Sequence, residues 1–136
     1  MSNKKILIVD DDRDVRLGYH IRLKANHYDT FFAADALSSI AEARKHQPDL
    51  IILDLGLPGG DGFVVMDRLK SNVYLAIIPV IVVSARDRHA NKDRALQAGA
   101  KAFLQKPVDN DELLAVIRQV LGEPETSTQQ TVQPRE

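Results

Sequence analysis

The strongest indication of the fold of this chain is the stretch Leu50-Ile51-Ile52-Leu53-Asp54-Leu55-Gly56-Leu57-Pro58. Four apolar residues in succession are followed at once by an acidic residue and then by a loop with glycine and proline. A continuous apolar run is typical of a strand covered on both faces, as in parallel sheets, whereas a half-exposed strand alternates. The segment therefore predicts a buried strand over 50–53 that ends at Asp54.

Other short apolar runs repeat this pattern, and segments with helical periodicity separate them. Together the five runs are 6–9, 28–32, 50–53, 80–83 and 102–104. Helical patterns lie near 13–26, around 37–43, over 63–70, before Gly99, and after Asp109, where Glu112 completes a pattern like a capping box. This alternation predicts a doubly wound α/β domain, a five-stranded parallel sheet flanked by five helices.

Composition limits the class of protein. The 136 residues are 44% hydrophobic and 27% charged, and they include no cysteine, so disulfides and thiolate metal sites are excluded. The net charge of −1 lacks the basic excess that direct nucleic-acid binding needs, and four scattered histidines do not suggest zinc. Without a signal-peptide or membrane-spanning pattern, we expect a cytoplasmic location and no membrane contact. We expect one domain over 1–121, followed by a disordered tail or linker over 122–136.

Polar residues follow four of the predicted strands. The first strand is followed by Asp10, Asp11 and Asp12. Asp54 follows the third strand, Ser84 the fourth, and Lys106 comes after the fifth. Because the carboxyl ends of parallel strands meet at one edge, where such sheets bind ligands, we expect these groups to converge.

Each of these residues also has an ordinary interpretation. The three adjacent acids could cap the first helix, Ser84 could bond to nearby backbone, and Lys106 could be a solvated loop lysine. Clustered carboxylates resist joint ionisation unless a cation neutralises them, and oxygen ligands without histidine or cysteine suit Mg²⁺ best. Carboxylates, Mg²⁺, a lysine and a hydroxyl around one aspartate indicate phosphoryl transfer, with the carboxylate able to accept the group.

The set of motifs over residues 4–121 resembles the receiver domain of two-component response regulators, in the single-domain form of chemotaxis regulators. The motifs are Ile6-Leu7-Ile8-Val9-Asp10-Asp11-Asp12, Leu53-Asp54 through Gly62, Val82-Val83-Ser84-Ala85 and Lys106-Pro107. The resemblance implies a flavodoxin-like sheet with strand order 2-1-3-4-5. It also implies that Asp54 is the phosphoacceptor, served by a phosphohistidine on a sensor histidine kinase or a histidine phosphotransfer protein.

The same resemblance assigns roles to the surrounding residues. Asp10, Asp11, Asp54 and the backbone carbonyl of Gly56 would hold Mg²⁺, with Asp11 the usual direct ligand and Asp10 often acting through water. Lys106 and Ser84 would bind the phosphoryl group. Ser84 would turn inward on phosphorylation, Phe103 would follow as the switching aromatic, and Pro107 would follow a cis peptide bond. Gly56 and Arg86 occupy positions that tune dephosphorylation in relatives.

Some positions depart from the family pattern. Ser84 is commonly Thr and Phe103 commonly Tyr, so the hydroxyl is kept at the first position and lost at the second. The segment 99–103, Gly-Ala-Lys-Ala-Phe, differs from the Gly-Ala-Asp-Asp-Tyr of many DNA-binding regulators, which puts their dimer contact in doubt. The region of the fourth helix is basic, so it is either a solvated face or a contact for an acidic partner. Its basic residues are Arg86, Arg88, Lys92, Arg94 and Lys101.

These features lead to one leading function and two alternatives. The leading function is a signalling module that catalyses only its own phosphorylation and dephosphorylation. The face formed by its fourth helix, fifth strand and fifth helix would control a downstream protein, and a homodimer could form on activation. One alternative is a degenerate receiver that acts as an interaction scaffold. The other is a phosphatase of the haloacid-dehalogenase type, which is disfavoured because Gly56 stands where that family has a second aspartate.

Overall fold

Residues 3–124 are described by the structure, a computed structural model. Five parallel strands form one sheet in the order β2-β1-β3-β4-β5, as predicted. The strands are β1 (Lys5–Val9), β2 (Asp29–Ala33), β3 (Leu50–Leu53), β4 (Val80–Ser84) and β5 (Ala102–Gln105). The helices between and after them are α1 (Arg13–Ala25), α2 (Ala36–His46), α3 (Gly62–Lys70), α4 (Arg88–Gln97) and α5 (Asn110–Leu121).

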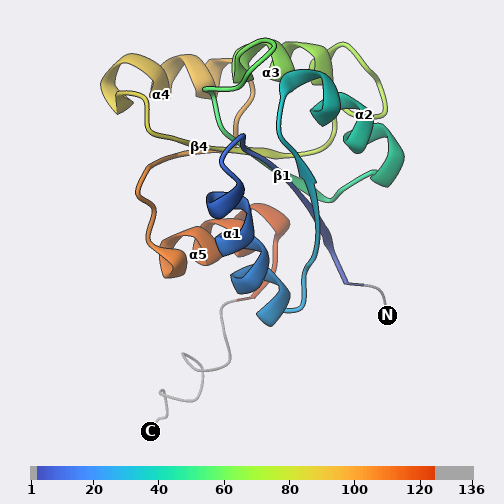
Figure 1. The fold of residues 1–136 in the computed structure, drawn as a ribbon, viewed down its shortest axis with the longest axis vertical. Coiled ribbons are helices and arrows are strands. Elements are labelled where there is room, and N and C mark those ends of the chain that lie inside the picture. Colours follow the sequence, from blue (N-terminus) through green and yellow to red (C-terminus); the bar gives the residue numbers. More distant parts are fainter. Residues whose placement is uncertain (1–2, 125–136) are drawn as a thin grey trace, which may run out of the picture.

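The helices cover both faces of the sheet. Figure 1 shows α1 and α5 on one face and α2, α3 and α4 on the other. Each face has its own apolar cluster: Leu23 and Ile117 lie in one, and Phe63 and Ala95 lie in the other. Every residue of β3 and β4 is buried, which explains why both are apolar without alternation, apart from Ser84 at the end of β4.

Only β3 has the predicted bounds, and each of the other four strands is shifted or extended by one residue; β1 begins at Lys5 and β5 ends at Gln105. Strand β2 begins at Asp29 rather than Tyr28, because the Tyr28 N–H donates to the Leu23 carbonyl and so belongs to the turn after α1. Strand β4 includes Ser84, which pairs in register with Gln105 of β5. Ser84 therefore lies within the sheet instead of following it.

Helix α5 ends at Leu121, the last residue of the expected domain. Gly122 follows it with a φ of 72°, and the Glu123 side chain accepts a hydrogen bond of 2.5 Å from the Tyr28 hydroxyl. The remainder of the predicted tail, 125–136, lies outside the described residues. Within 3–124, none of the helices combines the length and apolar character that a bilayer crossing requires.

Candidate functional site

The sheet places two aspartates at its carboxyl edge through backbone hydrogen bonds. The Asp54 N–H donates to the Val9 carbonyl at 2.9 Å, and the Asp10 N–H donates to the Ala33 carbonyl at 3.1 Å. These bonds continue the strand ladders one residue beyond β3 and β1. The backbone of both aspartates is therefore as fixed as the sheet itself.

Asp10, Asp11 and Asp54 form the acidic cluster that the sequence predicts. One carboxylate oxygen from each lies within 4.8 Å of the others. Asp10 is 2% exposed and Asp54 is 9% exposed, whereas Asp11 is exposed. The capping interpretation holds for their neighbour Asp12, whose side chain accepts hydrogen bonds from the backbone N–H groups of Asp14 and Val15 in α1. The run of three acids thus divides between a helix cap and the site.

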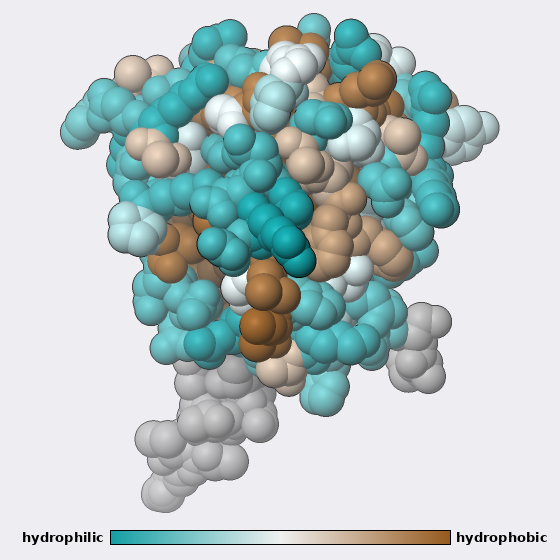
Figure 2. Space-filling view, viewed as in Figure 1, coloured by the Kyte–Doolittle hydropathy of each residue, from teal (hydrophilic) through white to brown (hydrophobic). Residues whose placement is uncertain are grey.

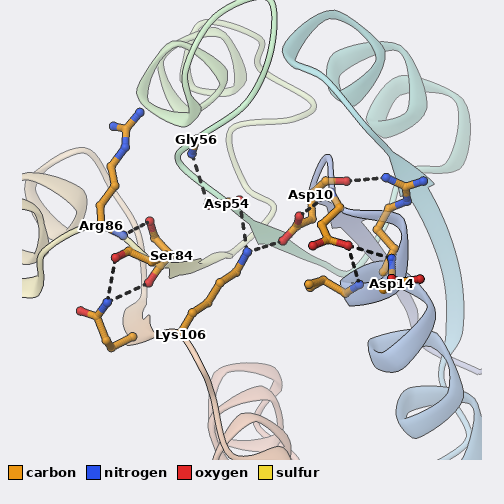
Figure 3. Close-up of polar contacts among 12 residues, drawn as sticks. Asp10, Asp14, Asp54, Gly56, Ser84, Arg86 and Lys106 are labelled. Atoms are coloured by element: carbon orange, nitrogen blue, oxygen red, sulfur yellow. Dashed lines mark hydrogen bonds and ion pairs between the residues drawn. The ribbon is translucent and has the colours of Figure 1, made fainter.

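Lys106 reaches into this cluster from the end of β5. Its Nζ lies 2.7 Å from Asp10 Oδ2 and 3.2 Å from Asp54 Oδ2 (Figure 3). Burial opposes the charged ammonium, but the hydrogen bonds and charges of the two carboxylates outweigh it and raise the pKa of Lys106. Lys106 therefore stays protonated and neutralises part of the buried negative charge.

The donor set fits a hard divalent cation. Three carboxylates from two strand ends converge, and only oxygen atoms are offered. One lysine cannot balance three carboxylates, so the cluster keeps an excess of negative charge that Mg²⁺ would neutralise. Gly56 lies beside it, and its N–H donates to Asp54 Oδ1 at 3.2 Å.

Ser84 and Arg86 lie on the other side of Asp54, at the end of β4. Ser84 is fully buried, and its Oγ accepts a hydrogen bond of 3.1 Å from the Arg86 N–H. Its carbonyl accepts from the Lys106 N–H at 2.9 Å and from the Gln105 side chain at 3.3 Å. Figure 3 shows Ser84 and Lys106 approaching the site from neighbouring strands.

The remaining predicted residues lie around this site. Phe103 is 4% exposed and belongs to the apolar cluster shared with α3 and α4, so its ring is packed inside the domain. The Lys106–Pro107 peptide bond is cis. The roles expected for Phe103, Gly56 and Arg86 stay predictions.

Comparisons of the sequence and the structure with known proteins identify the family of this chain. The sequence profile described as "Response regulator receiver domain" matches residues 6–118. The chain belongs to this family.

Solved structures support the assignment of this receiver domain. A CheY-like response regulator receiver domain protein from Methanospirillum hungatei is 30% identical, with a TM-score of 0.81, over 89% of this chain and 95% of that one. The receiver domain of sensor histidine kinase PA1611 from Pseudomonas aeruginosa is 25% identical, with a TM-score of 0.80, over 90% of this chain and all of that one. The latter structure has a magnesium ion coordinated in its active-site cleft.

Relatives of this receiver domain occur in proteins of different lengths. Response regulator PleD from Caulobacter vibrioides is 38% identical over 115 residues, which are 84% of this chain but 25% of PleD. The transcriptional regulatory protein KdpE from Escherichia coli is 40% identical over 85% of this chain and 50% of its own length. Protein PilH from Pseudomonas aeruginosa is 32% identical over 87% of this chain and 98% of its own length. The chain therefore spans a quarter of PleD and half of KdpE.

Sequence reasoning missed two contacts of the receiver site. Arg16 Nη1 donates to the Asp10 carbonyl at 2.7 Å and so holds the acidic loop from α1. Arg86 Nη1 lies 3.1 Å from Asp61 Oδ2, which joins the loop after β4 to the start of α3. The first contact could have been inferred from a helix that starts just after the acids, because its first turn brings Arg16 back toward Asp10. No sequence spacing indicates the second contact.

Proposed function

We propose that Asp54 accepts a phosphoryl group from a phosphohistidine of a sensor histidine kinase or a histidine phosphotransfer protein. The observation that carries this proposal is the buried Asp54 carboxylate at the sheet edge, flanked by Asp10, Asp11 and the ammonium of Lys106. One Asp54 oxygen attacks phosphorus as the P–N bond breaks. The histidine nitrogen takes the bonding electron pair, and an acyl phosphate forms on the receiver.

The residues around Asp54 supply positioning and charge. Lys106 is already within 3.2 Å of the attacking carboxylate and would bind an oxygen of the arriving group. Asp10, Asp11, Asp54 and the Gly56 carbonyl would hold Mg²⁺, which when bound neutralises charge that develops on the phosphoryl oxygens. The Ser84 hydroxyl is the group we expect to turn onto the phosphoryl oxygens, with Phe103 repacking behind it. That change would alter the surface of α4, β5 and α5 and control a downstream protein.

Water then hydrolyses the acyl phosphate, and two positions would set the rate. Gly56 has no side chain to cover Asp54, and a Cβ at this position would meet nothing within 4 Å. A freer approach of water at Gly56 would shorten the lifetime. The Arg86 side chain, which is paired with Asp61 in this structure, would have to leave that carboxylate to screen Asp54 from the other side. Gly56→Asn and Arg86→Ala test this through the half-life of the acyl phosphate, and unchanged half-lives would contradict it.

The α1 surface is where we expect the phosphodonor to dock. Leu17 and Ile21, one helical turn apart, are 51% and 62% exposed, and Figure 2 shows apolar surface over α1. A cavity of about 480 Å³ beside it is lined by Val15, Tyr19 and Pro107 and reaches Lys106. An apolar strip next to the acceptor suits a helix of a donor protein. Ile21→Asp is expected to slow transfer from a phosphorylated donor protein while labelling by acetyl phosphate stays unchanged.

The test of the proposed function is the intact mass after incubation with acetyl phosphate, with and without Mg²⁺. We expect the gain of one phosphoryl group, dependent on Mg²⁺, which Asp54→Ala abolishes without unfolding the domain. Two neighbouring acids provide a matched pair of variants. Asp11→Asn is expected to weaken Mg²⁺ binding, so that labelling needs a higher Mg²⁺ concentration. Asp12→Asn is expected to keep both the helix cap and the labelling. Labelling of Asp54→Ala as in the wild type would exclude Asp54 as the acceptor. Failure of the wild type both to gain mass and to bind beryllofluoride, a phosphoryl mimic, would leave only a scaffold function.

A further inference from the structure

The Ser84 hydroxyl is held by its own loop. Its Oγ accepts the Arg86 N–H at 3.1 Å, and the side chain is fully buried. Turning this hydroxyl toward Asp54 would leave the Arg86 N–H without its acceptor unless the loop also shifts. An unpaired backbone donor costs free energy where water cannot replace the lost partner, and Arg86 is half-buried, so the freedom of Ser84 depends in part on the freedom of the loop at Arg86.

The loop is in turn held by α3. Arg86 Nη1 lies 3.1 Å from Asp61 Oδ2, while Asp61 Oδ1 accepts the Phe63 N–H at 2.9 Å as the N-cap of α3. One carboxylate thus serves two purposes with its two oxygens. The Arg86 and Asp61 side chains are 37% and 34% exposed, so their ion pair is accessible to water but not fully solvated. Figure 3 shows the Arg86 side chain extending away from Lys106.

A second arginine fastens α4 to the same turn of α3. The Arg94 guanidinium lies over the Phe63 ring, 3.8 Å from its centroid. Helix α4 has only Ala95 among its buried residues, so apolar packing anchors it weakly. Side-chain contacts of two arginines with Asp61 and Phe63 therefore contribute much of what positions the β4–α4 segment.

We propose that Asp61 is a positioning residue that restrains switching: through Arg86 it keeps the Ser84 hydroxyl turned away from Asp54. The proposal rests on the proposed function of Asp54. The ion pair stabilises the unphosphorylated arrangement, so it must be overcome before Ser84 reaches a phosphoryl group. A ligand shifts such an equilibrium only by its difference in affinity for the two arrangements, so a weaker ion pair increases the apparent affinity for the phosphoryl group.

Asp61→Asn separates the two purposes of the carboxylate. Asparagine caps helices as well as aspartate does, so the Phe63 N–H keeps its acceptor, but the charge that holds Arg86 is lost. Affinity for beryllofluoride in the presence of Mg²⁺ is measured by isothermal titration calorimetry on the full chain. From the usual strength of exposed ion pairs, we expect Asp61→Asn to bind roughly two- to fivefold more tightly than the wild type. Equal or weaker binding overturns the proposal.

Two further variants test the route through Arg86. Arg86→Gln is expected to give a similar increase in affinity, and the double variant Asp61→Asn, Arg86→Gln no further increase, because both changes break one contact. If the affinity increase of the double variant equals the product of the two single increases, the two residues act independently, and the proposal is overturned. Asp61→Ala loses the helix cap as well as the ion pair. Its urea midpoint is expected to be lower than that of Asp61→Asn, and the difference measures how much the cap contributes to stability.

A measurement without ligand separates this proposal from the proposed function. Amide hydrogen exchange at Arg86 is expected to be faster in Asp61→Asn than in the wild type, because its bond to Ser84 Oγ opens more often. Unchanged exchange together with unchanged affinity refutes the role of Asp61 and leaves the phosphoacceptor intact. A wild type that neither binds beryllofluoride nor gains a phosphoryl group removes both proposals.

Discussion

Gly62, the first residue of α3, provides the sharpest structural prediction for the site. A Cβ at this position would lie 2.7 Å from the Asp54 carbonyl oxygen and 2.8 Å from Leu55 Cα. Both are backbone atoms, so no change of side-chain rotamer relieves the overlap. The Gly62 N–H also donates to the Leu55 carbonyl at 2.8 Å, which holds the two segments together. Gly62→Ala must therefore displace the backbone that carries Asp54.

The expected cost follows from the size of the overlap. Carbon contacts are most favourable near 3.5–4.0 Å, and forced insertion of one methyl group into a packed site costs about 1–3 kcal/mol. We expect the free energy of unfolding of Gly62→Ala to fall by about that amount, measured by urea denaturation with an unchanged m-value. We also expect slower labelling by acetyl phosphate, because the displaced carbonyl belongs to Asp54, the proposed acceptor.

Gly18 is the matched control for this experiment. It lies inside α1, and a Cβ there would meet nothing within 4 Å. Gly18→Ala should raise the free energy of unfolding by about 0.5–1 kcal/mol, because alanine favours helix over glycine. A Gly62→Ala protein as stable as the wild type would refute the steric argument. A destabilised one with an unchanged labelling rate would show that Asp54 does not depend on this packing.

Other perturbations have equally defined outcomes. Burial raises the pKa of Tyr19 to about 12 from 10.0, so its stabilising contribution is complete below pH 10 and is lost as pH rises toward 12. Thermal melts of Tyr19→Phe should therefore show a shallower loss of stability than the wild type across this window, and parallel curves would contradict it. Lys106→Met should destabilise the domain by about 1–3 kcal/mol without Mg²⁺, since the Asp10 carboxylate loses its cation, and saturating Mg²⁺ should recover part of the loss. In urea denaturation, Leu75→Ala should cost about 2–5 kcal/mol, whereas Ile77→Ser should change stability by less than about 0.5 kcal/mol, because these residues are 1% and 82% exposed.

The sheet was predictable because a single physical cause produces each apolar run. Residues 50–53 are buried on both faces, so the sequence there leaves little choice but a central strand. The convergence of Asp54 with Lys106 followed from the same cause, since parallel strands end at one edge. Topology alone thus brings together residues 52 positions apart in the chain.

Contacts that depend on loop shape were not predictable in this way. The ion pair between Asp61 and Arg86 joins two connections whose paths no periodicity describes. Which of the three acids caps α1 and which belong to the acidic cluster depends on where α1 begins. If the helix began one residue earlier, Asp11 would be the cap in place of Asp12. Spacing placed Phe103 on β5, but whether its ring packs inside or outside depends on the packing of α3 and α4, which the pattern of β5 does not contain.

The site therefore combines fixed and adjustable parts, and the division follows from the hydrogen bonds. Asp10, Asp54 and Lys106 each donate their backbone N–H to a neighbouring strand, at 3.1, 2.9 and 2.9 Å, so the backbone that carries the proposed acceptor and the charges around it cannot move without breaking the sheet. The Ser84 hydroxyl, in contrast, bonds to the loop that follows its strand, and that loop is held by side chains of α3. On the proposed function, a phosphoryl group on Asp54 would add negative charge and acceptor oxygens at a rigid point, so we expect the response to come from the parts that side chains alone restrain. For this reason we expect the strength of the half-exposed ion pair at Asp61 to affect switching more directly than further stabilisation of the sheet.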